Sequence, residues 1–260
     1  MAKKLGKCAL CGSNCELSFE HIPPKSAFNS KPIKPVSAME MLAKKKGFPW
    51  ETEGLPYQNL QKGMGLDSLC KQCNSDTGHW YGGEYAKFSQ RIALLAKSDL
   101  DPNYQSVEIK EVYPLRIIKQ VVSMFCSVNP QANIDDLRKF VLDKNAIGID
   151  KTKYKICMYF TRSNVKRFFG LHGGVDIIKG TNYLLSEITA FPLGFLLYFD
   201  PVANQKYKGI DITGFADSSY EECCSVKMPI VFYEVNNWLA HDYRSKEEIA
   251  GTIALKQKEE

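Results

Sequence analysis

Apolar residues recur at the spacing of an α-helix in three stretches in the middle of the chain. Between Glu84 and Lys97 they occupy one helix face, at positions 85, 88, 92, 95 and 96. Residues 114–128 are largely apolar and begin with a proline, which predicts a buried helix with proline at its first position. Residues 134–143 predict an amphipathic helix. A fourth helix is expected from Cys70 through Tyr81, with a break at Gly82-Gly83.

Short apolar runs replace this spacing from Tyr154 onward. They lie at residues 154–161, 166–171, 183–190, 193–199, 207–213 and 228–235, and Gly, Pro and Asp separate them. Such runs are typical of strands in an antiparallel sheet. Near the start, residues 17–22 alternate well enough to predict one short strand, which Pro23 and Pro24 end. The pattern therefore predicts an α+β fold.

A polar connection that begins at Asp99 indicates a domain boundary. We expect an N-terminal domain at residues 1–98 and an α+β domain with an antiparallel sheet at residues 99–260. Within the first domain, residues 36–46 predict a helix and residues 47–65 an inserted loop. The second domain carries no motif that assigns its role, so sensing, partner binding and oligomerisation all stay open.

The composition is ordinary for a globular protein, with 44% hydrophobic and 24% charged residues. The longest apolar runs are too short to span a bilayer, and no apolar segment follows the basic residues at the start, so we expect neither a membrane location nor a secretory signal. Nine scattered cysteines, an odd number, argue against a disulfide framework. We therefore expect a cytoplasmic protein.

The positive charge is concentrated at one end of the chain. Residues 1–97 contain 14 Lys and Arg against 8 Asp and Glu, whereas the remainder contains 20 against 21. A polyanion such as nucleic acid is a fitting partner for the first region, although a solvated lysine-rich surface would give the same count. The second region has no such excess.

Two Cys-x-x-Cys pairs, Cys8/Cys11 and Cys70/Cys73, predict one structural zinc site. Two residues between cysteines is the spacing that lets one turn present both sulfurs to a tetrahedral ion. Binding at such a site contributes on the order of 10 kcal/mol, comparable to the stability of a whole domain.

Three residues between and beside the cysteine pairs predict a second site. Zinc binding would bring the adjacent Glu20 and His21 close to Asn74, which follows Cys73. Hydrolysis of a phosphodiester needs a cation on the scissile phosphate and a base that takes a proton from water. Oxygen ligands suit Mg²⁺ or Mn²⁺, and a histidine accepts a proton near neutral pH. Since neighbouring residues of a strand point to opposite faces, Glu20 and His21 share a site only where the strand bends or ends.

Residues 5–97, with Cys8–Cys11, Glu20-His21-Ile22-Pro23 and Leu69-Cys70-Lys-Gln-Cys73-Asn74, resemble the HNH, or ββα-metal, endonucleases braced by four cysteines. The resemblance implies a zinc-bound treble-clef or ββα fold. It also implies that Glu20 and Asn74 bind a catalytic divalent metal and that His21 is the general base. His79 is a candidate third metal ligand.

The chain departs from the family pattern at three places. Glu20 stands where the family usually has Asp. Gly65 occupies the position of an Asn that orients the base in many members, and Asn59 could fill that role only through a different loop path. Gly78 stands where other members have a second metal-binding His, with His79 one residue further on.

The expected function is metal-dependent hydrolysis of double-stranded DNA, and analogy suggests a regulated effector of antiviral, anti-phage defence. Two alternatives stay open. One is a catalytically inactive zinc-binding module that binds nucleic acid, and the other is a protein-interaction protein that zinc stabilises. The second domain is expected to bind a regulatory partner or a second copy of the chain.

Overall fold

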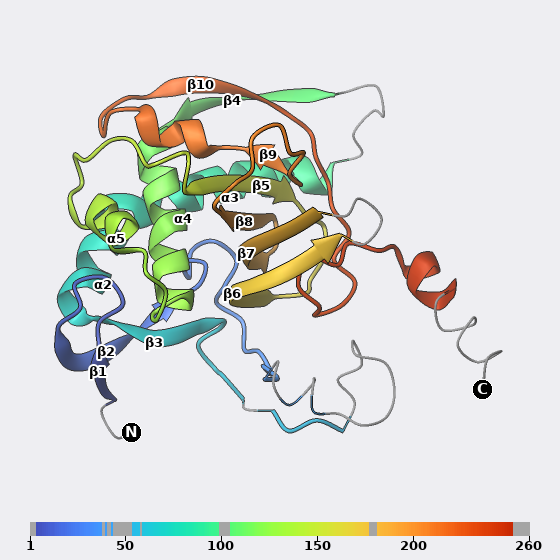
Figure 1. Ribbon diagram of the computed structural model, residues 1–260, viewed down its shortest axis with the longest axis horizontal. Coiled ribbons are helices and arrows are strands. Elements are labelled where there is room, and N and C mark those ends of the chain that lie inside the picture. The colour runs from blue at the N-terminus through green and yellow to red at the C-terminus, as the bar shows by residue number, and fades with distance from the viewer. Residues whose placement is uncertain are drawn as a thin grey trace.

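The computed structural model describes residues 4–37, 40, 43, 54–57, 59–98, 105–176 and 181–251. Helices and antiparallel sheets occur together within it, which confirms the predicted α+β fold (Figure 1). Most of the predicted helix at residues 36–46 lies outside the described residues, as do residues 47–53 and 58 of the expected insertion.

A three-stranded antiparallel sheet, in the order β1-β2-β3, forms the N-terminal end of the fold. Its strands are β1 (Leu5–Lys7), β2 (Asn14–His21) and β3 (Gly65–Cys70). The last two pair although residues 22–64 separate them, and the ladder has a bulge between Ser18 and Phe19. Strand β3 leads directly into helix α2 (Lys71–Thr77), which contacts both strands (Figure 1). Two strands and a helix thus form one local unit.

The helical path continues after α2, and the predicted break at Gly82-Gly83 is wrong. A π-helical turn, η1 (Gly78–Gly82), joins α2 to α3 (Gly83–Lys97), and both glycines have right-handed helical dihedral angles. Gly82 is buried against α4, where a Cβ atom would lie 3.6 Å from Oε1 of Gln120. This is an ordinary contact distance, so the packing does not require glycine here, and the two glycines continue the helix.

Helix α4 (Pro114–Val128) is buried along nearly its whole length, as its sequence predicts. It contacts β3 in the N-terminal part and β6 in the later sheet, and it also packs against α3 and α5 (Asp135–Leu142). An element surrounded on all sides by protein must be apolar on all sides, which explains its composition.

The later sheet has five antiparallel strands in the order β6-β7-β8-β5-β9. Their bounds are β5 (Tyr154–Phe160), β6 (Arg167–Asp176), β7 (Thr181–Ala190), β8 (Leu193–Phe199) and β9 (Ile210–Asp211). The predicted strands are therefore confirmed at four places. At the fifth, residues 207–213, only two residues pair, and the 3₁₀ helix η2 (Thr213–Asp217) follows.

A separate two-stranded sheet pairs β4 (Ser106–Val112) with β10 (Cys224–Pro229). Strand β4 has no counterpart in the sequence-based prediction, because charged residues separate its few apolar side chains and its partner lies more than a hundred residues later. The strand predicted at 228–235 is placed wrongly. Beyond Pro229 only an isolated bridge between Phe160 and Phe232 continues it.

The predicted boundary at residue 98 stays a prediction, but side chains on its two sides share one hydrophobic cluster. The rings of Tyr85 and Phe195 lie 6.0 Å apart, and Tyr81 donates a hydrogen bond of 2.7 Å to the carbonyl of Val141. Within the described part of the chain, none of the helices is long and apolar enough to cross a membrane.

Candidate metal centre and acid–histidine site

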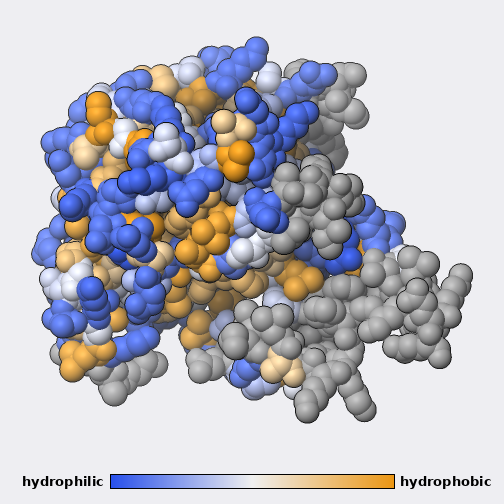
Figure 2. All heavy atoms as spheres, in the orientation of Figure 1, coloured by the Kyte–Doolittle hydropathy of each residue, from blue (hydrophilic) through white to orange (hydrophobic). Residues whose placement is uncertain are grey.

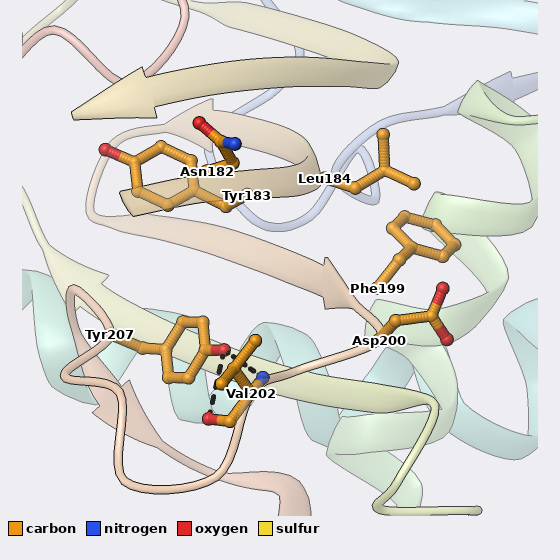
Figure 3. A pocket seen from close by; sticks show the side chains of 7 residues that line it. All are labelled: Asn182, Tyr183, Leu184, Phe199, Asp200, Val202 and Tyr207. Atoms are coloured by element: carbon orange, nitrogen blue, oxygen red, sulfur yellow. Dashed lines mark hydrogen bonds between the residues drawn. The ribbon is translucent and has the colours of Figure 1, made fainter. Parts of the chain in front are cut away.

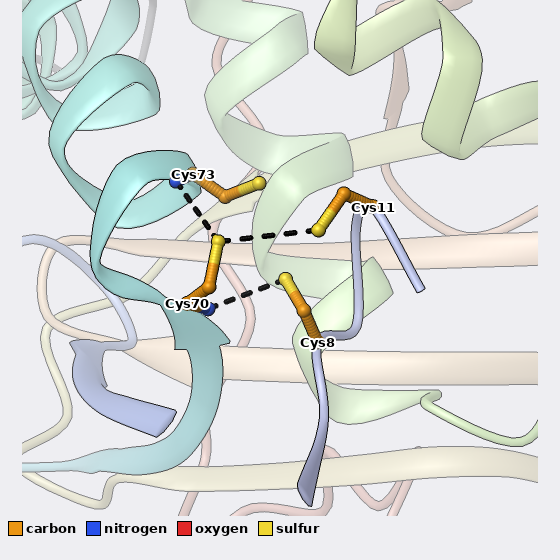
Figure 4. A group of neighbouring side chains, drawn as sticks. All are labelled: Cys8, Cys11, Cys70 and Cys73. Atoms are coloured by element: carbon orange, nitrogen blue, oxygen red, sulfur yellow. Dashed lines mark hydrogen bonds between the residues drawn. The ribbon is translucent and has the colours of Figure 1, made fainter. Parts of the chain in front are cut away.

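The four cysteines of the two Cys-x-x-Cys pairs lie close enough to bind one metal ion. Their sulfur atoms all lie within 4.8 Å of one another, and the sulfurs of Cys11 and Cys70 are 3.9 Å apart (Figure 4). Four thiolates around a tetrahedral zinc have sulfurs roughly 3.8 Å apart. Donor type and spacing therefore both fit zinc. Cys15 lies outside this group.

Local backbone structure aims each sulfur at the centre. The first pair sits in a tight turn in which Gly12 has φ 75° and its N–H donates to the carbonyl of Cys8. Cys70 ends β3 and caps α2, since its sulfur accepts a 3.3 Å hydrogen bond from the N–H of Cys73. The N–H of Cys70 donates at 3.3 Å to the sulfur of Cys8. The two pairs therefore hold each other even before a metal is considered.

Two of the four thiols, those of Cys8 and Cys73, resist ionisation in the absence of a cation. Burial raises the pKa of Cys73 far above its ordinary value, and burial also raises that of Cys8. Burial would raise the pKa of Cys11 as well, but hydrogen bonds with Ser13 and the neighbouring thiols lower it to about 6. A divalent cation would reverse the two upward shifts, because it stabilises thiolates.

Glu20 is a buried acid with no positive partner among the described residues. It faces Leu66 across the β2–β3 ladder, and its side chain is only 6% exposed. Burial raises the pKa of its carboxyl to about 8. Because a nearby cation lowers the pKa of a carboxyl, a bound metal would convert this group to a carboxylate ligand.

His21 is the last residue of β2 and is half-buried. Its ring meets that of Phe19 edge-on at 5.0 Å. Burial lowers the pKa of His21, the positive charges of Lys25 and Lys62 lower it further, and a hydrogen bond to the backbone of Lys62 opposes them. The imidazole is therefore neutral at pH 7, the state that a general base requires.

The ladder is regular at Glu20 and His21, which pair with Leu66 and Gly65. Neighbouring side chains consequently leave the strand on opposite faces. The pairing stops at His21, however, so both side chains border the same strand end. The irregularity of this ladder, the bulge between Ser18 and Phe19, lies before Glu20. It is therefore not a bend between Glu20 and His21, which a shared site would need.

Gly65 cannot be replaced by the Asn that many HNH members carry at this position. A Cβ atom there would lie 2.1 Å from the carbonyl oxygen of Glu20, a distance that no side chain tolerates. The imidazole of His21 instead donates a hydrogen bond to the backbone of Lys62. Asn59, the alternative from the sequence, is exposed.

Asn29 organises the two loops beside His21, and sequence reasoning did not identify it. Its fully buried amide donates 2.7 Å hydrogen bonds to the carbonyls of Pro23 and Met64 and accepts one of 2.8 Å from the N–H of Met64. It thereby ties the segment after β2 to the segment before β3, which includes Lys62. In the sequence, Asn29 stands between Phe28 and Ser30 in a loop and belongs to no motif, so nothing there indicates a role at the site.

Asn74 and His79 occupy different surroundings. The side-chain N–H₂ of Asn74 donates 3.0 Å hydrogen bonds to the hydroxyl of Ser18 and the carbonyl of Phe19, which fixes the amide against β2 and leaves its oxygen as the candidate ligand. His79 is exposed on η1. Five residues after Asn74, it does not share the helix face of that residue.

The described surface also has a hollow of about 300 Å³ lined by residues of the C-terminal half: Asn182, Tyr183, Leu184, Phe199, Asp200, Val202 and Tyr207 (Figure 3). None of the predicted site residues lines it. The face of the molecule seen in Figure 2 is largely hydrophilic, with apolar side chains gathered near its centre. Leu171 in β6 and Leu184 in β7 of the five-stranded sheet are 42% and 39% exposed.

Comparison with known proteins finds no family model, curated protein or solved structure that matches the chain.

Proposed function

We propose that the chain is a zinc-braced, HNH-type endonuclease that hydrolyses phosphodiester bonds in DNA with the help of a divalent cation. The observation that carries the proposal is the local unit β2–β3–α2. It presents a buried acid, a neutral imidazole and a fixed amide, and it is joined to a cluster of four thiols.

Each residue has a role that follows from its surroundings. Zinc, held by Cys8, Cys11, Cys70 and Cys73, fixes the start of α2 against β2. Glu20 and the oxygen of Asn74 would hold Mg²⁺ or Mn²⁺, which supplies charge neutralisation at the scissile phosphate when bound. His21 takes the proton of the attacking water, and the Lys62 carbonyl orients the ring and stabilises its protonated form. Asn29 positions that carbonyl.

The test is nicking of supercoiled plasmid with Mg²⁺ or Mn²⁺ by the wild type and by His21→Ala. Loss of a general base typically lowers the rate by roughly 100-fold or more, and we expect a decrease of this size in the nicking rate of His21→Ala. His172→Ala, which removes a half-buried histidine from β6, is the matched control and should nick as the wild type does.

Nicking that survives His21→Ala would refute the assignment of the base. A wild type that binds DNA without nicking it under either metal would favour the inactive binding module. Unchanged migration of duplex and single-stranded DNA at low salt would favour the protein-interaction alternative, because electrostatic binding is strongest there. A role in anti-phage defence stays a prediction by analogy.

A further inference from the structure

A group of lysines from distant parts of the sequence gathers around the loop that follows His21. Lys25 and Lys31 belong to this loop, Lys62 precedes β3, Lys97 ends α3 and Lys166 precedes β6. We call these five residues the lysine surface. The first four lie in the basic region of residues 1–97, whereas Lys166 comes from the part of the chain that has no positive excess.

Lys166 is tied directly to the residue that organises the site. Its ammonium donates hydrogen bonds of 3.3 Å to the side-chain oxygen of Asn29 and 3.4 Å to the carbonyl of Phe28. Its side chain is half-buried, and burial together with the charge of Lys31 lowers its pKa. Lys31, two residues after Asn29, therefore brings a second positive charge near Lys166, beside the loop of His21.

Lys97 extends this group on the other side of the same loop. Its ammonium lies 6.0 Å from the ring centre of Phe28 and 5.8 Å from that of Phe191, and the two rings meet edge-on at 5.4 Å. Phe28 is 39% exposed. At the opposite end, Lys62 lies 5.6 Å from the ring centre of Phe19, which contacts His21.

The five lysines form no ion pair with a carboxylate in the described part of the chain. Lysines elsewhere do: Lys87, Lys151 and Lys155 pair with Glu84, Asp217 and Asp211. Asp67 is an exposed carboxylate that lies opposite Phe19 in the β2–β3 ladder. It forms no ion pair with any of the five lysines. Holding like charges together without counter-charges is unfavourable, and a bound polyanion would relieve it.

We infer that the lysine surface binds the phosphate backbone of DNA on its way to His21, so that the C-terminal half contributes to substrate binding through Lys166. This inference rests on the proposed function, since it names how the same site holds its substrate. It adds a role to the second domain, which, for lack of a charge excess, is expected from the sequence to bind a regulatory partner or a second copy of the chain. The lysines contact separate groups, with Lys166 at Asn29, Lys97 at Phe28 and Lys62 at Phe19, instead of converging on one point, which fits an extended anion.

Binding can be measured separately from cleavage in the His21→Ala background. Fluorescence anisotropy with a duplex of about 20 base pairs, at several salt concentrations and without divalent metal, gives both the affinity and its salt slope. We expect Lys97→Gln with Lys166→Gln to weaken binding roughly 10-fold or more near 0.1 M salt and to lower the slope by about two, one for each phosphate contact.

The matched control is Lys110→Gln with Lys227→Gln, which removes two exposed lysines from the β4–β10 sheet, on the side away from β3 (Figure 1). It should leave affinity and slope unchanged. Zinc content and thermal unfolding of each variant show whether it is folded, and Lys97→Arg with Lys166→Arg should restore binding.

An unchanged affinity and slope in the Gln variant would overturn the inference, even if the wild type nicks plasmid. Tighter binding to vesicles of anionic phospholipid than to duplex DNA would also overturn it. If the wild type never nicks DNA but the Gln variant loses DNA binding, the proposed endonuclease function is refuted and DNA binding by the lysine surface is supported.

Discussion

Two buried glutamates, one in each half of the chain, are held in opposite ways. Glu20 is 6% exposed and Glu187 is fully buried. Burial raises the pKa of Glu20 to about 8. Burial would raise the pKa of Glu187 too, but Arg167 beside it lowers that pKa below its ordinary value.

The difference lies in the partners. The Glu187 carboxylate accepts hydrogen bonds from Tyr159, Thr189, Tyr243 and the backbone of His241, and it forms a 2.7 Å ion pair with Arg167, which is also buried. Arg167 in turn donates to backbone carbonyls of residues 237, 239 and 242. This is a complete network that fastens the segment after β10 to the sheet. Glu20 has no such counter-charge among the described residues, so burial keeps its carboxyl protonated near neutral pH. Under the proposed function, a bound divalent cation would ionise it.

The largest expected effect comes from removing the zinc that holds the Glu20 region together. Cys70→Ser should lose zinc, from about one ion per chain to none, and with it stability on the order of 10 kcal/mol. Metal analysis and thermal unfolding measure the two losses. Cys15→Ser, outside the cluster, is the control that should keep its zinc. Full zinc occupancy in Cys70→Ser would contradict the shared site.

An intermediate effect is expected from breaking the complete network at Glu187. Arg167→Met leaves a buried carboxylate without its counter-charge, which should cost about 3–5 kcal/mol in urea unfolding at neutral pH. Adding Glu187→Gln removes the stranded charge and should recover part of that loss. Nicking by the folded fraction should not change. If Arg167→Met lowers the free energy of unfolding by less than about 1 kcal/mol, the Arg167–Glu187 ion pair does not hold the C-terminal segment to the sheet.

Near pH 5, the smallest effect on stability is expected from a substitution at Glu20, which should also abolish nicking. Glu20→Gln should change the free energy of unfolding by less than about 1 kcal/mol near pH 5, since the wild-type group is protonated there when folded. The folded state keeps this proton up to about pH 8 whereas the unfolded chain releases it near its ordinary pKa.

The zinc-loaded, Mg²⁺-free wild type should therefore lose stability relative to Glu20→Gln as pH rises, by up to about 1.4 kcal/mol per unit. Glu187 contributes the opposite sign, because its lowered pKa stabilises the fold above its ordinary pKa and that stability is lost on acidification. Urea unfolding at several pH values measures the Glu20 difference, and a flat difference would show that the carboxyl is already paired. Nicking by Glu20→Gln should be lost at every pH.

Local sequence patterns predicted the parts of the fold that depend on near neighbours. The spacing within Cys8–Cys11 and Cys70–Cys73 requires only single turns, and the four cysteines do meet. The spacing of apolar residues predicted α3, α4 and α5, because the apolar face of a helix is formed by residues only a few turns apart in sequence. It failed at Gly82-Gly83, where the helix continues despite the low helix propensity of glycine because η1 and α3 both pack against α4.

The sequence by itself determined the four-cysteine cluster, the helices α3, α4 and α5 and most strands of the large sheet, since each depends on residue types at short separations. Only the tertiary structure decided what surrounds His21. Gly65 is forced by the closeness of Glu20's backbone, and Asn29 acts through contacts 35 residues away with Met64. Lys166 reaches Asn29 across 137 residues of sequence. The opposite behaviour of Glu20 and Glu187 likewise depends on which distant side chains approach each carboxyl, and no local pattern records that.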